Sequence, residues 1–389
     1  MKSMSIRKNI PGSGIRQVME AALKVPDAIH LEVGEPAFDT PFFIKEAAKA
    51  AINQNYTHYT PNAGLISLRE SIAKHIEKQY KVPVVPEQVV VTPGAINAIC
   101  LSLLTLVDIG EEVLIPDPGW PNYEQVVLGQ GAVPVRYRLN PDEGFSPDFK
   151  DLEKNVSDKT KVIIINSPGN PTGAVFSKET IISLVEFAKK HDLYIVSDEI
   201  YDGITFEKEH ISTLPFDEDG RVIGIFGFSK NYAMTGWRIG YAVAPINIAT
   251  AMIPNIELLV SCTSAISQKA AEAALNDPRS PEFVQEMTNT YKTRFEKAYQ
   301  ILIEENMKVY KSEGAFYLLV NLEDTGLKGM ELALAILKEE HVAVAPGSTF
   351  GPSAESMIRI SFAGSDEDIV EGVKRICHFA KKHSNKVTV

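Results

Sequence analysis

One lysine and one arginine, Lys230 and Arg238, stand in the mostly apolar and aromatic stretch from residue 227 to residue 241. The neighbouring side chains include Phe228, Tyr232, Met234 and Trp237. Loss of water around the Lys230 amine would lower its pKa and free its lone pair to attack a carbonyl carbon, which is Schiff-base chemistry. The planar guanidinium of Arg238 suits a phosphate or a carboxylate. An aldehyde that carries a phosphate would satisfy both residues, although a solvated lysine and a surface arginine would give the same short pattern.

Three further residues directly follow predicted buried strands. They are Asp198 after the apolar run 193–196, Asn170 after the run 162–165, and Trp120 after the run 113–115. Ligands of parallel sheets bind outside the carboxyl ends of the strands, so we expect these side chains to converge. A carboxylate that is buried at such a strand exit needs a cationic partner. Taken singly, Asp198 is also compatible with a helix N-cap and Asn170 with a simple turn.

The ring of pyridoxal 5'-phosphate (PLP) has requirements that these residues match. Its nitrogen must stay protonated for the ring to withdraw electrons, and a buried Asp198 would enforce that charge. Its phenolic oxygen needs hydrogen-bond donors, for which Asn170 and Tyr201 are candidates, and its flat face suits Trp120. The sequence therefore predicts a PLP ring site.

The phosphate and the aldehyde of the same cofactor also have candidate partners. Gly94, Ala95 and Ile96 open a predicted helix, where free backbone N–H groups and the helix dipole bind anions. Together with Arg238 they would hold the phosphate, and Lys230 would bind the aldehyde.

Apolar strand candidates alternate with helical patterns from residue 88 to residue 243, which indicates an α/β fold with a mainly parallel sheet covered by helices on both faces. After Pro278 and Pro281 the pattern changes to a long charged helix, short strands and two more helices, which indicates a smaller α+β domain. We therefore expect an N-terminal arm at residues 1–30 joining the small domain, a large domain at 31–280 and a small domain at 281–389.

The composition is that of a globular protein of 389 residues with 44% hydrophobic and 23% charged residues. A net charge of -11 argues against nucleic acid as a partner, and the apolar runs are too short to span a membrane. No export signal is visible, and the three widely spaced cysteines are expected to be free thiols, so we expect a cytoplasmic protein. No His or Cys pair has metal-ligand spacing, and no metal is predicted.

Three motifs carry a family resemblance over nearly the whole chain: residues 167–173, Ser-Pro-Gly-Asn-Pro-Thr-Gly, residues 197–201, Ser-Asp-Glu-Ile-Tyr, and residues 228–241, Phe-Ser-Lys-Asn-Tyr-Ala-Met-Thr-Gly-Trp-Arg-Ile-Gly-Tyr. In this order and spacing the chain resembles the class I/II aminotransferases of fold type I, the aspartate aminotransferase-like superfamily. The resemblance implies a fold type I PLP-dependent transferase, in which Lys230 forms the Schiff base and then moves a proton. The resemblance also implies the roles that the chemistry above suggests for Asp198, Asn170, Tyr201 and Trp120.

Further roles come from the resemblance alone. It implies that Arg359 binds the α-carboxylate of the substrate, with Gly34 and Asn170 beside it. Tyr59 resembles a tyrosine that reaches the phosphate in the neighbouring subunit, which implies a homodimer.

The chain departs from the family pattern at two places. Many relatives have a serine three residues before the lysine, where this chain has Gly227, so Ser229 is our candidate for a replacement contact. Some aspartate-specific relatives have a lysine where this chain has Ile96, so Arg16 on the arm is our candidate for pairing with an acidic side chain of the substrate.

The predicted activity is transfer of an amino group from an L-amino acid to a 2-oxo acid, with 2-oxoglutarate as the expected acceptor, by a ping-pong route through the pyridoxamine form. The donor stays open: Ile96, Tyr59 and Tyr123 would favour apolar or aromatic side chains, and Arg16 an acidic one. Two alternatives remain at this point, a PLP-dependent C–S or β-eliminating lyase on the same fold and a PLP-fold binding or regulatory protein without turnover.

Overall fold

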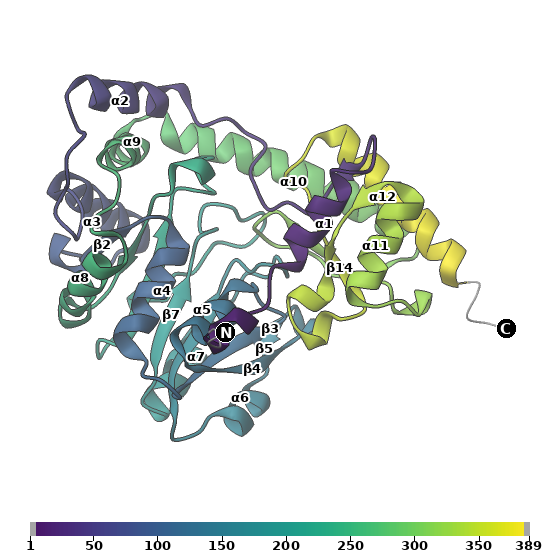
Figure 1. Cartoon of the computed structure of the whole chain (residues 1–389), viewed down its shortest axis with the longest axis horizontal. Helices are drawn as coiled ribbons and strands as arrows, with labels where there is room; N and C mark the ends of the chain where they lie inside the picture. The colour runs from purple at the N-terminus through teal and green to yellow at the C-terminus, as the bar shows by residue number, and fades with distance from the viewer. Residues whose placement is uncertain (1–4, 385–389) are drawn as a thin grey trace, which may run out of the picture.

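The computed structural model describes residues 5–384 and contains a large sheet of eight strands (Figure 1). From one edge to the other, the strands are β2 (Val89–Thr92), β9 (Gly240–Val243), β8 (Val222–Gly227), β7 (Tyr194–Asp198), β6 (Thr160–Asn166), β3 (Glu112–Asp117), β4 (Val133–Asn140) and β5 (Ser146–Pro147). The strands from β8 to β4 run parallel to their neighbours, whereas β9 is antiparallel to β2 and β8, and β5 is antiparallel to β4. The prediction of a mainly parallel sheet is confirmed.

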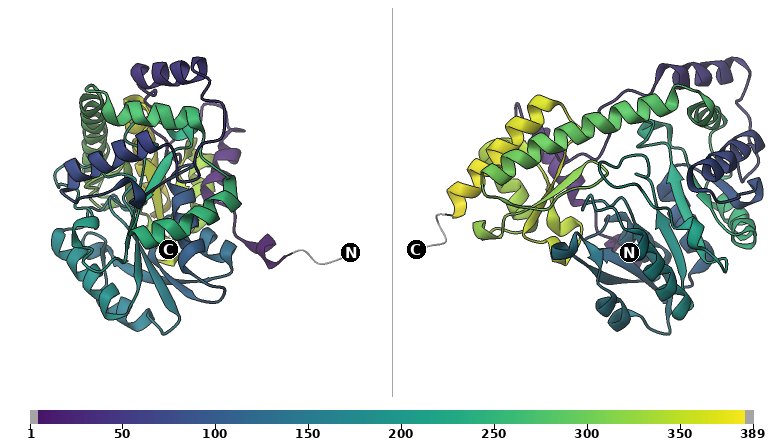
Figure 2. Two further views of the ribbon diagram at one scale, coloured as in Figure 1. Left: turned by 90° about the vertical axis from the view of Figure 1, so that its left-hand side faces the viewer. Right: turned by 180° about the vertical axis from the view of Figure 1, so that it is seen from behind.

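Both faces of this sheet are covered, as the alternation along β6 shows. Val162 and Ile164 pack into one hydrophobic cluster, and Ile163 and Ile165 pack into another, because successive side chains of a strand point to opposite faces. The surrounding helices are α2 (Phe42–Asn53), α3 (Ile66–Tyr80), α4 (Ala95–Leu106), α5 (Asn122–Gln130), α6 (Phe149–Asn155), α7 (Lys178–Lys190), α8 (Ile246–Val260) and α9 (Ala265–Asn276). Figure 2 shows helices on both sides of the large sheet.

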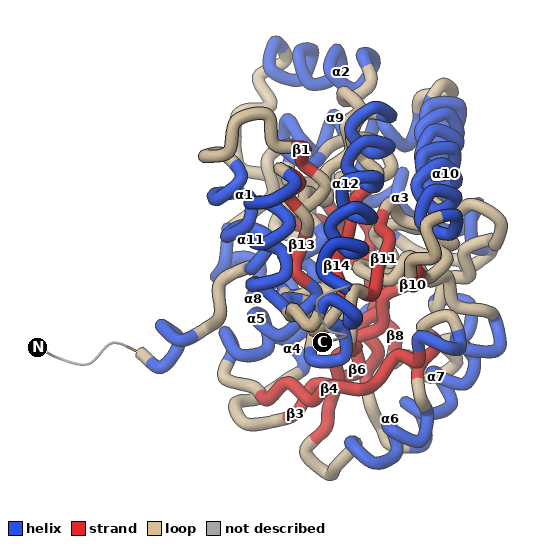
Figure 3. Tube along the Cα trace, turned by 90° about the vertical axis from the view of Figure 1, so that its right-hand side faces the viewer, coloured by secondary structure: helices blue, strands red, loops and turns tan. Residues whose placement is uncertain are grey.

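A second sheet, with four antiparallel strands, is built from the C-terminal part of the chain (Figure 3). Its order is β10 (Lys308–Val309), β11 (Tyr317–Asn321), β14 (Met357–Ser361) and β13 (Ala345–Pro346). The helices of this part are α10 (Ser280–Glu304), α11 (Gly329–Glu340) and α12 (Asp366–Ser384). Their apolar sides form a third hydrophobic cluster around β11 and β14.

The N-terminal segment packs onto this second part of the fold. Helix α1 (Gly14–Ala22) contributes Val18 and Ala22 to the third cluster, and β1 (Ile29–His30) pairs in parallel with β12 (Val342–Ala343). These contacts support an arm that joins a C-terminal domain, while the boundaries at residues 30 and 280 stay predictions.

The run at 342–345 is divided between two strands, because β12 pairs with β1 and β13 pairs with β14. Helices α8 and α9 were not predicted: Pro254 lies inside α8, and the alanines of α9 give little contrast between its faces. Within residues 5–384, no helix is long and apolar enough to cross a membrane.

Candidate active site

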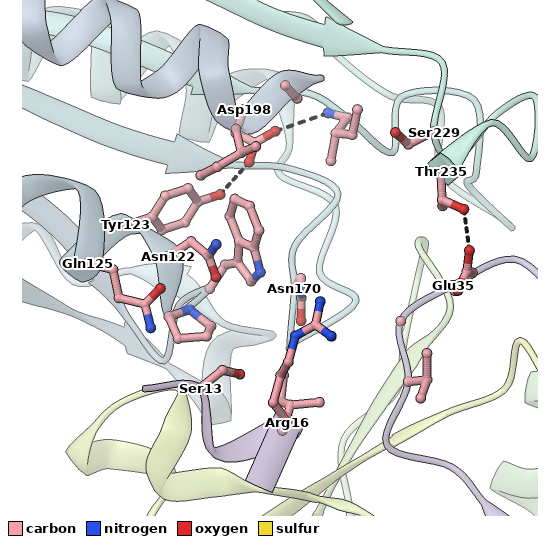
Figure 4. A pocket seen from close by; sticks show the side chains of 18 of the residues that line it. Ser13, Arg16, Glu35, Asn122, Tyr123, Gln125, Asn170, Asp198, Ser229 and Thr235 are labelled. Carbon is pink, nitrogen blue, oxygen red and sulfur yellow. Dashed lines mark hydrogen bonds between the residues drawn. The ribbon is translucent and has the colours of Figure 1, made fainter. Parts of the chain in front are cut away.

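A cavity of about 940 Å³ lies at the carboxyl ends of the parallel strands and brings most of the predicted site residues together (Figure 4). Helix α1, the segment after β1 and strands β11 and β14 complete its walls. The predicted residues that line it are Arg16, Gly34, Ala95, Ile96, Trp120, Asn170, Asp198, Tyr201, Ser229, Lys230, Arg238 and Arg359. The convergence expected from the strand exits is therefore present in the fold.

Lys230 follows β8 and extends its amine into the cavity. The amine donates a hydrogen bond to the carbonyl oxygen of Gly34 at 2.7 Å and lies 5.8 Å from the ring centre of Tyr201 and 5.6 Å from that of Phe316. Burial is the largest cause that lowers the pKa of Lys230, to about 8, while the nearby charge of Glu35 opposes this shift. A neutral amine, the form that attacks a carbonyl, is thus accessible at mildly alkaline pH.

Asp198 ends β7 and is only 3% exposed. One carboxylate oxygen accepts a hydrogen bond from the Tyr123 hydroxyl at 2.6 Å, and the other accepts one from the backbone N–H of Ile200 at 3.3 Å. Burial raises the pKa of Asp198 to about 6, although the Tyr123 hydrogen bond lowers it. Across residues 5–384 no lysine, arginine or histidine forms an ion pair with Asp198, so its carboxylate is available to a cation in the cavity.

Arg359 in β14 is 1% exposed and lies between two aromatic rings. Its guanidinium carbon is 4.2 Å from the ring centre of Tyr317 and 5.1 Å from that of Phe350. It donates to the side-chain oxygen of Asn170 at 3.0 Å and to the carbonyl oxygen of Glu32, while its Nε has no hydrogen-bond partner. A buried cation with an unused donor in a cavity wall fits a carboxylate ligand.

Gly94 directly precedes α4 and lies beside Arg238. Its φ of +86° favours glycine, and a Cβ there would lie 2.7 Å from Nη2 of Arg238, so the close approach requires the absence of a side chain. The amides of Ala95 and Ile96 follow at the start of the helix, where backbone N–H groups lack intrahelical partners. Arg238 donates to the carbonyl oxygen of Thr235 at 2.8 Å and keeps its other nitrogens for a ligand. This combination forms an anion site.

At Gly227, the position of the expected serine, the side chain of Ile200 leaves little room for a Cβ. A Cβ on Gly227 would lie 2.7 Å from Cδ1 of Ile200. Ser229, our candidate replacement, is buried and lines the cavity (Figure 4).

Trp120, in the loop after β3, lines the cavity and meets the ring of Tyr123 edge-on, at 5.5 Å between ring centres. The sequence suggested Tyr123 as a substrate contact. In the structure the Tyr123 hydroxyl donates a hydrogen bond to Asp198, and the residue is 1% exposed. Tyr123 therefore supports the carboxylate.

Two predicted residues, Tyr59 and Arg16, make no side-chain hydrogen bond with the described residues. Tyr59 is 90% exposed and does not line the cavity of its own chain. Arg16 projects from α1 into the cavity mouth (Figure 4), and it makes no hydrogen bond or ion pair with the described residues.

Sequence reasoning missed Tyr317, whose hydroxyl lies 2.8 Å from the hydroxyl of Tyr201. No local motif marks Tyr317, because its partner is 116 residues away in the chain. The described residues contain no group of three or more His, Cys, Asp or Glu side chains that could hold a metal ion.

The cavity fits PLP on the chemistry of these groups. A protonated ring nitrogen would satisfy the buried carboxylate of Asp198, and a phosphate would satisfy the anion site formed by Arg238 and the start of α4. The amine of Lys230 is the nucleophile that an aldehyde requires.

Comparison with known proteins gives the same result. The family model for aminotransferase class I and II matches residues 26–376. The aspartate aminotransferase of Pyrococcus abyssi is 39% identical over 94% of this chain and 94% of that protein, and the aromatic-amino-acid aminotransferase 2 of Thermococcus litoralis is 38% identical over 94% of each. The solved structure of aspartate aminotransferase from Thermus thermophilus with maleate is 34% identical, with a TM-score of 0.93 over 97% of this chain and 100% of that one. The chain therefore belongs to the class I and II aminotransferases and is a PLP-dependent aminotransferase of fold type I.

Proposed function

We propose that this cavity moves the amino group of an L-amino acid to 2-oxoglutarate in two half-reactions. The observation that carries the proposal is the placement of the Lys230 amine in one cavity with the Asp198 carboxylate and the Arg359 guanidinium. When bound, PLP supplies an aldehyde that accepts amino groups and a ring that withdraws electrons from the substrate Cα. The chain supplies binding, orientation and proton transfer.

Lys230 has two tasks in this proposal. With PLP in the cavity, its amine would be the group that holds the aldehyde until a substrate amine takes its place. With its amine free, Lys230 would accept the proton of the substrate Cα and could return it, since a pKa of about 8 lets the amine act as a base near neutral pH.

The other residues hold the reacting groups. Asp198 would keep the ring nitrogen charged, Asn170 and Tyr201 would donate to the phenolic oxygen, and Trp120 would cover the ring face. The phosphate is bound by Arg238 and Ser229 and by the amides of Gly94, Ala95 and Ile96. The α-carboxylate of the substrate is bound by Arg359, with Asn170 and Gly34 beside it.

Arg16 supports a preference for substrates with a second carboxylate. It is a cation in the cavity wall without a partner among the described residues, and Ile96, at the place of the lysine of some aspartate-specific relatives, cannot supply this charge. The two relatives above carry aspartate and aromatic names, so both donors belong in the first panel.

The dimer is also part of the proposal, with Tyr59 completing the phosphate site of the partner subunit. Support comes from the exposure of Tyr59 and of an apolar helix end close to its loop. Asn62 donates to Glu257 of α8 at 2.7 Å, and the exposed Leu258, Leu259 and Val260 follow. An apolar surface of this kind is typical of subunit contacts.

The central experiment offers a panel of amino acids with 2-oxoglutarate to the purified holoenzyme and measures both the 2-oxo acid product and ammonia. We expect one 2-oxo acid per glutamate formed and no ammonia. Release of ammonia in step with product would contradict transfer. Lys230→Ala should be inactive, whereas Lys308→Ala, which removes an exposed lysine, should match the parent chain.

The dimer is tested by mixing two inactive variants, Tyr59→Ala and Lys230→Ala, after unfolding and refolding them together. A mixed dimer has one site with both defects and one site with neither, so up to about a quarter of the parent activity should return at equal mixing. Absence of any recovery, with mixed dimers shown by mass spectrometry, would contradict a shared site.

A further inference from the structure

Tyr317 connects the four-stranded sheet to the eight-stranded sheet inside the active-site wall. It begins β11 of the four-stranded sheet and is 1% exposed. Its hydroxyl lies 2.8 Å from the hydroxyl of Tyr201, which follows β7 of the eight-stranded sheet. The Tyr317 hydroxyl has no other hydrogen-bond partner within residues 5–384. The contact is therefore specific to Tyr201.

The ring of Tyr317 also supports Arg359. Strands β11 and β14 are antiparallel, with Tyr317 opposite Ser361 and Leu319 opposite Arg359, so Tyr317 and Arg359 are diagonal neighbours. The guanidinium carbon stands 4.2 Å from the ring centre, which is a cation–π distance in a buried place. The ring thus restricts where the guanidinium can lie.

The same side chain presses against the segment that receives Lys230. A Cβ on Gly34 would lie 2.2 Å from the Tyr317 hydroxyl oxygen, and the carbonyl oxygen of Gly34 accepts the hydrogen bond from Lys230. Tyr317 therefore touches, in one place, the arginine, the tyrosine and the backbone that surround the reacting groups.

The direction of the bond between the two hydroxyls follows from hydrogen counting. A tyrosine hydroxyl has one hydrogen to donate. If Tyr201 gives its hydrogen to the phenolic oxygen of PLP, as the proposed function has it, Tyr317 must be the donor between the two tyrosines. Donation into Tyr201 polarises that hydroxyl and strengthens its own hydrogen bond.

We propose that Tyr317 is a positioning residue that fixes Tyr201 as a donor to the cofactor and Arg359 as the receptor of the substrate carboxylate. This inference rests on the proposed role of Tyr201. The two effects use different parts of the side chain: the hydroxyl acts on Tyr201 and the ring acts on Arg359. Two substitutions can therefore separate them.

Tyr317→Phe removes the hydroxyl and keeps the ring. In the holoenzyme, the pH at which the visible absorbance of the lysine-bound cofactor changes should rise by about half a unit, a roughly threefold change in proton affinity. The reason is that a weaker donor leaves more negative charge on the phenolic oxygen, which holds the nearby proton more tightly. The KM for the amino acid should change less than about twofold, because the ring still lies against Arg359.

Tyr317→Leu removes the ring as well. We expect the same spectroscopic shift and, in addition, a KM for the amino donor that rises by roughly tenfold, because the guanidinium loses its cation–π contact. Equal KM values for the Phe and Leu variants would overturn the role of the ring.

Tyr291→Phe is the matched control, since Tyr291 is also fully buried in the same hydrophobic cluster but its hydroxyl has no hydrogen-bond partner. It should leave both the absorbance pKa and the KM unchanged, and a shift equal to that of Tyr317→Phe would overturn the proposal.

Tyr201→Phe separates this inference from the proposed function. If it does not shift the absorbance, the proposed cofactor contact fails; if it shifts and Tyr317→Phe does not, the inference on Tyr317 fails alone. The double variant should shift no more than Tyr201→Phe, because the hydroxyl of Tyr317 acts through Tyr201. Additive shifts would contradict that route.

Discussion

The replacement Asp198→Asn should have opposite effects on the stability of the cofactor-free protein and on cofactor binding. Asp198 is buried without a cationic partner, and burial raises its pKa from 3.8 to about 6. The folded protein therefore binds this proton more tightly than the unfolded chain. Below pH 3.8 the carboxyl is neutral in both states, and above pH 6 the folded state carries a buried charge, so stability falls as pH rises between these values.

The magnitude follows from the size of the shift. A difference of about two pKa units corresponds to about 3 kcal/mol, which is the cost that the ionised carboxylate imposes on folding at pH 8. At pH 4.5 about 1 kcal/mol of this cost remains by the same relation. Asparagine has the same shape and carries no charge; its oxygen can accept from the Ile200 N–H, and its amide nitrogen can donate to the Tyr123 hydroxyl oxygen.

The assay is urea unfolding of the cofactor-free protein at fixed protein concentration, at pH 8 and pH 4.5. We expect Asp198→Asn to raise the free energy of unfolding at pH 8 and to lose most of this gain at pH 4.5, while its affinity for PLP falls at both. Asp324→Asn removes the same charge from an exposed position and should show no such pH-dependent gain. A variant that is less stable than the parent at pH 8, or whose gain ignores pH, would refute the reasoning.

Three other predictions concern the cofactor. Lys230→Ala should prevent borohydride from linking PLP covalently to the chain, as measured by mass spectrometry, and should lower the rate of amino-group transfer by several orders of magnitude. Near-normal turnover would exclude Lys230 as the Schiff-base residue. Because burial lowers the pKa of Lys230 to about 8, the rate at which the cofactor-free protein gains visible absorbance from added PLP should rise with pH from 6 and level off above 8; a flat stopped-flow profile would argue against this. Gly94→Ala should weaken PLP binding by roughly tenfold or more, because the new Cβ would meet Arg238 at 2.7 Å and φ is +86°. The control is Gly110→Ala, which also has a positive φ, of +85°, but has open space around it. If equilibrium dialysis gives the two variants equal affinities for PLP, the anion site at Gly94 and Arg238 is contradicted.

The sequence predicted those parts of the site that local patterns specify. Asp198 and Asn170 directly follow apolar runs, and parallel strands bring their carboxyl ends together, so their convergence could be expected from the order of residues alone. Gly94 and the amides after it were predictable for the same reason, since a strand, a glycine and a helix follow one another in the chain.

Contacts between distant segments were not predictable in this way. Tyr123 reaches Asp198 across 75 residues, and Tyr317 reaches Tyr201 across 116, so no spacing in the sequence reveals either pair. Helix α8 was not predicted because apolar residues occupy several of its sides, and Leu258 among them is 77% exposed. Its sequence therefore lacks the clear alternation of an apolar and a polar face that indicates a helix.

The packing of Ile200 against Gly227 reaches beyond a single contact. Because a Cβ at position 227 would lie 2.7 Å from Cδ1 of the isoleucine, any side chain at 227 requires that methyl group to move. A serine at position 227 of this chain should therefore be accommodated best beside a smaller or differently shaped residue at position 200. A design that introduces a serine at position 227 should therefore first replace Ile200 with a smaller residue.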